Sequence, residues 1–176
     1  MIKAEIQNIR SKIDQIDDSI AKLLSERILC SKKIGLLKEE LKKSSETDII
    51  GAYDPIRENQ IIEQLKTKHN SIPLNGIETI FRQIISLCRN NSHKSNICLI
   101  GKFEDFDYKS YFGNFCGYQS CSDTSSWLNE LTKDRYNIGL TDFLPDEKTS
   151  KELNSLGFEQ ASIAKNSLPI KVYFHK

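Results

Sequence analysis

The sequence predicts an all-α N-terminal domain, residues 1–93, followed by a small α/β domain, residues 96–176. Between residues 6 and 41, apolar side chains recur at alternating steps of three and four, the pattern of one long helix with a coiled-coil-like seam. From residue 97 onward, strand-like and helix-like segments alternate instead. Three helices of very unequal length cannot bury the first one, so we expect an intertwined helical homodimer.

The individual elements follow from local signals. The first helix is expected over residues 4–43, before a polar loop. Asp54 is a favoured N-cap and Pro55 a favoured first residue for a second helix that ends near Lys68. A third helix is expected from residue 74 to about 91. The α/β domain is predicted to have strands at 97–101, 115–119, 136–140 and 170–174, helices at 125–131 and 145–156, and a core built from the aromatic segment 103–115.

Arg27 stands in the apolar seam of the first helix, where Ile or Leu belongs. A buried arginine without an anion costs several kcal/mol, so we expect a carboxylate of the protein or a ligand beside it. Lys38 follows after almost three turns, on the same face and roughly 16 Å along the axis. Arg10 lies about 25 Å before Arg27, so it can reach the same small molecule only across an antiparallel partner helix.

The same residues also have purely structural explanations, which the sequence leaves open. Arg27 can belong to a structural ion pair, with Glu58 as a possible partner. Lys38 can be solvated. Arg57 and Glu58 can simply decorate the start of the second helix, where acidic side chains are favourable.

Several motifs carry a resemblance to a known family. Residues 9–17, 23–27, 34–38, 54–58 and 80–89 resemble the all-helical, AroQ-class chorismate mutases in both polar positions and apolar pattern. The resemblance covers about residues 5–92. It implies conversion of chorismate to prephenate in the biosynthesis of phenylalanine and tyrosine, by a homodimer with no cofactor and no metal. The reaction is pericyclic, so it depends on conformational restraint and on cations near the breaking ether bond.

The resemblance also implies roles for individual residues. Arg27, and Arg10 of the other subunit, would bind the two carboxylates, and Lys38 would reach a carboxylate and the ether oxygen. The remaining positions are Asp54 and Glu58 on the ring hydroxyl, Arg57 framing the pocket, and Cys88 where the family often has Ser near a carboxylate.

Ser92 departs from the family, which usually has Gln or Glu at this position as a second donor to the ether oxygen. A serine side chain is too short for that contact. Removing one such donor can cost roughly 3–4 kcal/mol in the transition state. Asn91 or Arg89 can compensate; otherwise the protein is slow or has drifted toward ligand sensing.

The C-terminal domain bears a fainter resemblance to part of the prephenate dehydratase domain, on residues 97–101 and 137–140. It has no Thr-Arg-Phe motif and no Gly-Pro-x-Gly-Thr turn, so we expect a reduced lobe without dehydratase chemistry. Two alternatives to mutase activity remain: an isochorismate pyruvate lyase on the same scaffold, or a weakly active sensor or partner module of a shikimate-pathway enzyme.

Composition and charge argue against several other classes of protein. The net charge is +1, which does not favour a nucleic-acid partner, and no apolar run suggests a membrane span or a secretory signal. The five cysteines form no CxxC pair, which disfavours a metal site. Cys30 and Cys88 are expected to be buried thiols of a cytoplasmic protein. The three histidines, His69, His93 and His175, are expected at the surface.

Overall fold

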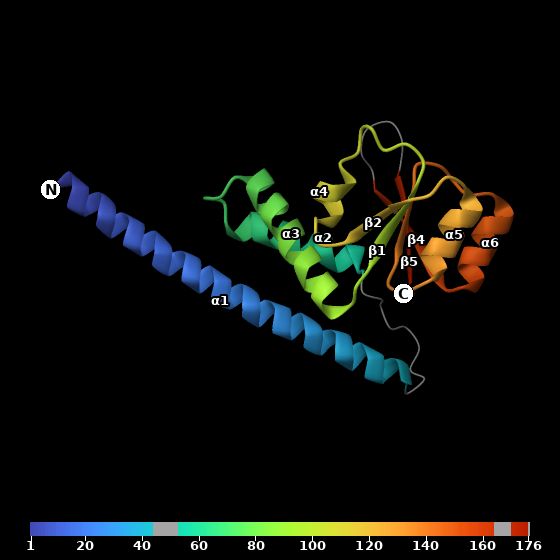
Figure 1. The fold of residues 1–176 in the computed structure, drawn as a ribbon, viewed down its shortest axis with the longest axis horizontal. Helices are drawn as coiled ribbons and strands as arrows, with labels where there is room; N and C mark the ends of the chain where they lie inside the picture. Colours follow the sequence, from blue (N-terminus) through green and yellow to red (C-terminus); the bar gives the residue numbers. More distant parts are fainter. Residues whose placement is uncertain (44–52, 164–169, 176) are drawn as a thin grey trace.

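The computed structural model describes residues 1–43, 53–163 and 170–175, and it confirms a helical region followed by a small mixed sheet (Figure 1). The helical region consists of α1 (Ile2–Lys43), α2 (Pro55–Lys68) and α3 (Leu74–Ser92), as the sequence pattern predicted. Helix α3 packs against both α1 and α2. The predicted polar loop before α2 lies outside the described residues.

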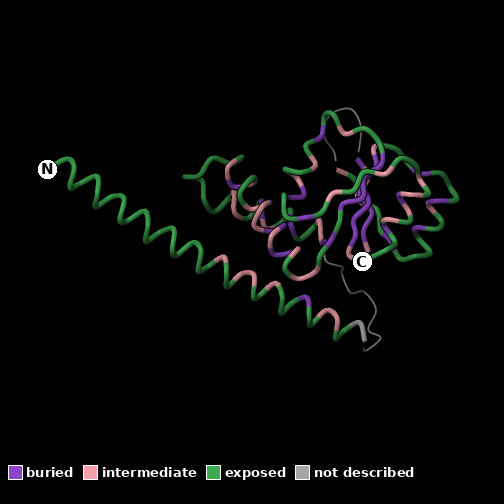
Figure 2. The backbone as a smooth tube through the Cα atoms, viewed as in Figure 1, coloured by how far each residue is buried: buried purple, intermediate pink, exposed green. Residues whose placement is uncertain are grey.

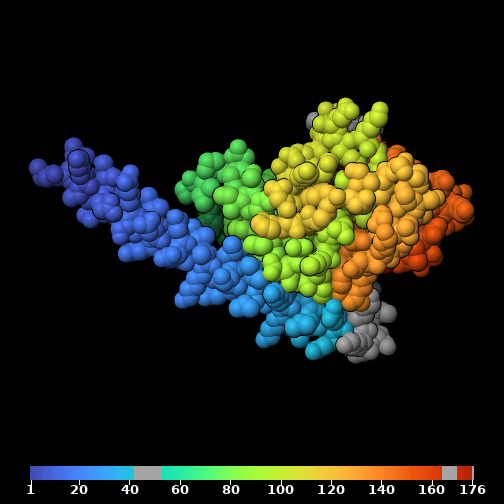
Figure 3. Space-filling model, in the orientation of Figure 1, coloured from blue at the N-terminus to red at the C-terminus, as the bar shows by residue number. Residues whose placement is uncertain are grey.

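The N-terminal part of α1 extends away from the rest of the chain (Figures 1 and 3). Its whole length up to about residue 23 is exposed in Figure 2. The apolar side chains of its stripe are 45–63% exposed; they are Ile6, Ile9, Ile13, Ile16, Ile20 and Leu23. A contiguous apolar stripe of this size is typical of an interaction surface. No helix within the described residues is long and apolar enough to cross a membrane.

The α/β region contains one five-stranded sheet, ordered β2-β1-β3-β5-β4. Strands β1 (Asn96–Ile100), β2 (Gly117–Ser120) and β3 (Ile138–Thr141) are parallel. Strand β5 (Ile170–His175) runs antiparallel to β3 and to the edge strand β4 (Phe158–Ile163). The helices of this region are α4 (Tyr108–Phe112), α5 (Thr124–Thr132) and α6 (Glu147–Ser155).

The two faces of the sheet have different partners, because successive side chains of a strand point to opposite faces. On one face, Cys98 and Ile100 pack with Trp127 of α5 and Leu153 of α6. The other face, with Leu99 among its members, packs with Phe112 of α4 and with Tyr53, which precedes the N-cap residue of α2. The helical region and the α/β region therefore share a hydrophobic core.

Several local expectations were wrong. The sequence predicts no helix or strand within 103–114, yet this segment contains α4, which is only five residues long and so shows no helical period. Strand β4 was missed because it is an edge strand with mostly exposed side chains. Cys30 is exposed rather than buried, since α3 covers only one side of α1. Phe115, expected in the core, is also largely exposed.

Gly139 of β3 allows the packing between β3 and α5 to be tested. A Cβ atom there would lie 2.5 Å from the indole ring of the fully buried Trp127. We expect Gly139→Ala to lower the free energy of unfolding by about 1–3 kcal/mol through overpacking, measured by urea denaturation.

Gly76→Ala is the matched control, because a Cβ atom in this helical position meets nothing closer than 3.9 Å. This substitution should instead stabilise the protein by about 0.5–1 kcal/mol. Equal effects of the two substitutions would contradict the packing described for β3.

Candidate active site

One cavity lies where the C-terminal half of α1 faces the start of α2, the end of α3 and the α/β region. Its volume is about 500 Å³, within the range of about 300–1,000 Å³ that is usual for small-molecule sites. Seven of the eight residues expected from the sequence line it: Arg27, Lys38, Asp54, Arg57, Glu58, Cys88 and Ser92. The structure thus brings together residues from three helices around one space.

The cavity wall carries a net positive charge. Its lining includes five Arg or Lys side chains and three carboxylates, which leaves two positive charges with the histidines neutral. Apolar side chains such as Ile34, Ile61 and Ile85 complete the wall. A wall of this kind suits a small dianion that also has an apolar ring or chain.

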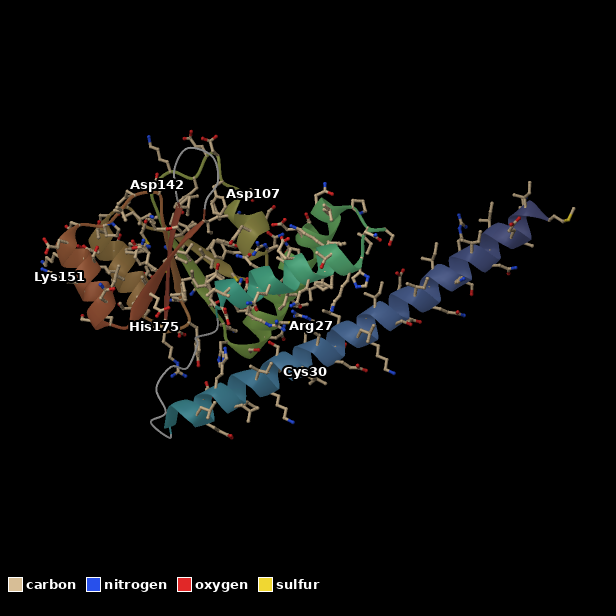
Figure 4. The ribbon with its side chains drawn as sticks, turned by 180° about the vertical axis from the view of Figure 1, so that it is seen from behind. Arg27, Cys30, Asp107, Asp142, Lys151 and His175 are labelled. Carbon is tan, nitrogen blue, oxygen red and sulfur yellow. The ribbon has the colours of Figure 1, made fainter. Side chains whose placement is uncertain are left out.

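Arg27 lies on the side of α1 that faces α3 (Figure 4). Its Nη1 donates a hydrogen bond to Sγ of Cys88, at 2.7 Å. A neutral thiol does not balance a guanidinium charge, and no ion pair joins Arg27 to a carboxylate in the part of the chain described. The alternative in which Glu58 pairs with Arg27 is not realised, because Glu58 pairs with Arg89, and Arg27 can receive an anionic ligand.

Lys38 lines the same cavity toward the C-terminal end of α1. Burial lowers the pKa of its ammonium group, and the charge of Asp54 partly opposes that effect. Asp54 itself caps α2: its Oδ1 accepts a hydrogen bond from the backbone N–H of Arg57, at 2.8 Å. This cap, followed by Pro55, directs Arg57 and Glu58 to the first turn of α2 at the cavity.

Glu58 forms a buried ion pair with Arg89, a residue for which the sequence suggested a different role. Its Oε1 accepts a hydrogen bond from Nη1 of Arg89, and both side chains are almost fully buried. Burial raises the pKa of Glu58, while the charge of Arg89 opposes that rise. Arg89, suggested as a substitute for the donor missing at Ser92, lines the cavity, and its two Nη atoms already donate to Glu58 and to the carbonyl of Phe112.

Ser92 and Cys88 are both at the cavity, one helical turn apart on α3. The hydroxyl of Ser92 donates to the carbonyl oxygen of Cys88 at 3.0 Å and shares a hydrogen bond with Ser31, also at 3.0 Å. Asn91, the other candidate substitute, donates to the carbonyl of Leu87 on the exposed side of the helix. Ser92 thus presents a short hydroxyl that its own helix already uses.

The α/β region contributes cavity residues that sequence reasoning missed. Arg135, Tyr136 and His175 line the cavity, together with His93 and Glu39. Oε1 of Glu39 accepts a hydrogen bond from the hydroxyl of Tyr136 at 3.0 Å and lies 3.4 Å from Nη2 of Arg135. No local pattern predicts a contact across almost one hundred residues. His93 and His175, expected at the surface, are partly exposed and line this cavity.

Gly35 is the one sequence signal for this contact. The ring of His93 stacks on Tyr136, with ring centroids 3.9 Å apart. A Cβ atom on Gly35 would lie 2.9 Å from Nε2 of His93, so a larger residue here would require the histidine ring to shift. An isolated glycine inside a helical pattern often marks such a close approach.

Arg10, the eighth expected residue, does not line the cavity. It lies on the exposed part of α1, about 25 Å along the helix from Arg27 at 1.5 Å per residue. A role for Arg10 in a pocket therefore requires a second chain.

Comparison with known proteins gives a family match and a relative. Residues 9–93 match the family model described as chorismate mutase type II. The chain is similar to a protein of Aquifex aeolicus (strain VF5) described as a bifunctional chorismate mutase/prephenate dehydratase. The two are 28% identical over 153 residues, which is 82% of this chain and 40% of the relative. No solved structure matches.

The match to the Aquifex aeolicus protein extends beyond the helical region. The chain spans about two fifths of the length of the curated relative it matches. Because the match covers 82% of the chain, it cannot be confined to the helical region and must include part of the α/β region. The two regions of this chain are therefore related to one continuous protein.

His93 allows the contact with the α/β region to be tested in solution. Burial lowers its pKa; Arg135 and Lys38 act in the same direction, whereas Glu39 and Asp134 oppose it. Glu39→Gln removes an opposing negative charge, so we expect the pKa of His93 to fall further, measured by NMR titration. Glu40→Gln, on the exposed face of the same helix, should leave the titration of His93 as it is in the wild type. A rise with Glu39→Gln would contradict this geometry.

Proposed function

Because residues 9–93 are a type II chorismate mutase domain, we propose that this protein is an isomerase that converts chorismate to prephenate. The observation that carries the proposal is the single cavity at which Arg27, Lys38 and Arg57 lie with Asp54 and Glu58. The wall's net charge of two suits a substrate with two carboxylates. The helical fold and the family match support the same conclusion.

The reaction makes modest chemical demands. Within one molecule, the ether C–O bond breaks while a new C–C bond forms, and nothing is added or lost. Negative charge grows on the ether oxygen as its bond breaks, and the substrate must be held in a compact conformer. Fixed cations and a shaped, largely apolar wall supply both effects, and no nucleophile or proton transfer is needed.

The proposed roles follow the cavity from one end to the other. Arg27 binds a carboxylate, and Lys38 reaches a carboxylate and the ether oxygen. Asp54 and Glu58 accept a hydrogen bond from the ring hydroxyl, and Arg57 frames the pocket. Cys88 lies beside the carboxylate that Arg27 binds, which fits its hydrogen bond with that guanidinium.

We further propose that the active form is a homodimer in which Arg10 serves the pocket of the other subunit. The exposed apolar stripe of α1 is the support for this assembly. Full burial of a single aliphatic side chain contributes about 1.5–3 kcal/mol, so pairing two such stripes is strongly favourable. The same pairing would bring Arg10 of one chain toward Arg27 of the other if the helices are antiparallel.

Ser92 favours a second candidate function, that of a slow enzyme or a ligand sensor that works with another enzyme of the pathway. Its short hydroxyl is hydrogen-bonded to Cys88 and Ser31, so the pocket has no long amide or carboxyl donor at this position. Binding of chorismate without turnover would identify the sensor. Turnover of isochorismate in preference to chorismate would instead identify the lyase.

The first test is loss of chorismate absorbance with the purified full chain. We expect turnover to prephenate, and a loss of at least about a hundredfold in kcat/KM for Arg27→Ala and for Lys38→Ala, because each removes a cation that stabilises developing or bound negative charge. Lys151→Ala is the control, since Lys151 lies on α6, far from the cavity (Figure 4), and pairs only with exposed Glu147 among the described residues. Equal loss in all three variants would contradict the proposed pocket.

A mixing experiment tests the shared site. Arg10→Ala and Arg27→Ala should each be inactive alone. If Arg10 acts across the interface, a heterodimer of the two has one intact and one doubly damaged pocket. An equal mixture, refolded or coexpressed, should then recover about one quarter of wild-type activity, because half of the dimers are mixed. No recovery in a mixture shown to contain heterodimers would mean that Arg10 does not serve the other subunit.

A further inference from the structure

The Arg89–Glu58 pair connects the proposed pocket to the α/β region. Arg89 of α3 and Glu58 of α2 are 4% and 7% exposed. While Nη1 of Arg89 donates to Glu58, Nη2 donates to the carbonyl oxygen of Phe112, at 2.8 Å, and lies 3.5 Å from Sγ of Cys116. One guanidinium therefore joins α2, α3 and the end of α4.

One carboxylate oxygen of Glu58 is left for a ligand. Oε1 is used by Arg89, and no hydrogen-bond partner for Oε2 lies among the residues that the structure describes. Glu58 lines the cavity. Oε2 is therefore the oxygen of Glu58 that we expect to accept a hydrogen bond from a bound hydroxyl.

A second contact fixes the other end of the same segment. Tyr53, one residue before the cap Asp54, is 2% exposed. Its ring packs against Phe112 and Phe174, with ring centroids 5.6 and 5.4 Å apart, and the guanidinium of Arg89 lies 5.2 Å from its centroid. The first turn of α2 is therefore held to α4 and the sheet on both sides of Asp54 and Arg57.

We propose that Arg89 is a positioning residue for the mutase reaction: it holds Glu58 ionised and oriented in the pocket, and it ties that orientation to the α/β region through the carbonyl of Phe112. This role rests on the proposed function. In this role Arg89 acts through Glu58, to which its Nη1 donates, although its side chain also lines the cavity. The α/β region is then part of the machinery that shapes the pocket, in addition to supplying Arg135 and Tyr136 to its wall.

The pH dependence of activity separates this role from a merely structural one. Glu58 is faced by Arg89 and Arg82 of α3 and by Asp54 of its own helix, and both arginines oppose the rise in its pKa that burial causes. Without Arg89, the pKa of Glu58 must rise further. At a pH below the pKa of Glu58, each unit by which this pKa rises lowers the ionised fraction of Glu58 about tenfold. Activity should therefore be lost first at low pH and recover toward high pH.

The experiment compares pH profiles of kcat/KM for chorismate in full-length variants. For Arg89→Met we expect the acid limb to move upward by about 1–3 pH units, the usual influence of a close opposite charge. The matched control is Arg82→Met: Arg82 is the other buried arginine of α3, but it is hydrogen-bonded to Asn59 and paired with Glu78, and its charge acts on Glu58 without a hydrogen bond. Its acid limb should move less, even if both variants melt at a lower temperature.

Two further variants complete the test. Arg89→Met combined with Glu58→Gln should be no slower than Glu58→Gln alone and should lose the displaced limb, because only an ionisable Glu58 produces it. Arg89→Lys covers the case in which Arg89→Met does not fold. Lysine keeps a cation near Glu58 but cannot replace the two-sided contact with Phe112, so the acid limb should stay and kcat should fall by about tenfold or more.

The outcomes are distinguishable. If the wild type turns over chorismate but Arg89→Met shows the acid limb and the activity of Arg82→Met, the ion pair only stabilises the fold, and the proposal is wrong. Wild-type kcat in Arg89→Lys would overturn the link to the α/β region. A wild type with no turnover of chorismate contradicts the proposed function itself, and with it this role of Arg89.

Discussion

The cost of burying charge determines how this molecule is built around its cavity. Burying an ionised side chain without a partner is strongly unfavourable. Each charged side chain in the cavity wall is therefore expected to pair with another residue or with a bound ligand. Glu58 is paired with Arg89, and Asp54 offsets part of the burial of Lys38. Arg27 donates to a thiol, and no carboxylate pairs with it within residues 1–43, 53–163 and 170–175. The unpaired positive charge in the wall is consistent with a dianionic substrate that completes the balance when it binds.

The α/β region is an integral neighbour of this cavity. One face of its sheet packs on α5 and α6, and the other meets α4 and Tyr53, next to the cap of α2. Arg135 and Tyr136 reach Glu39 on α1 from the opposite side. A change in the α/β region therefore has two physical routes to the pocket, one through Phe112 and Arg89 and one through Glu39 and His93.

The sequence predicted the helical region well because its signals are local. A period of 3.6 residues, an Asp-Pro helix start and an arginine in an apolar seam can each be read from a short stretch. The partner of Glu58 could not be read in this way: Arg89 lies 31 residues away, and its position is decided by how α3 packs on α2 and α4. The same holds for Tyr136, which meets α1 only after the whole chain has folded.

The long helix α1 explains why one chain supplies most, but not all, of the expected site. Its C-terminal half packs on α3 of the same chain, so Arg27 and Lys38 face a cavity made by their own subunit. Its N-terminal half, up to about residue 23, extends beyond that contact with an uncovered apolar stripe. Because a straight helix keeps Arg10 about 25 Å from Arg27, Arg10 can never enter the pocket of its own chain. The exposed apolar stripe and the position of Arg10 therefore both favour a second copy of the chain. A copy that covers the apolar face of α1 would also bring its own pocket toward Arg10.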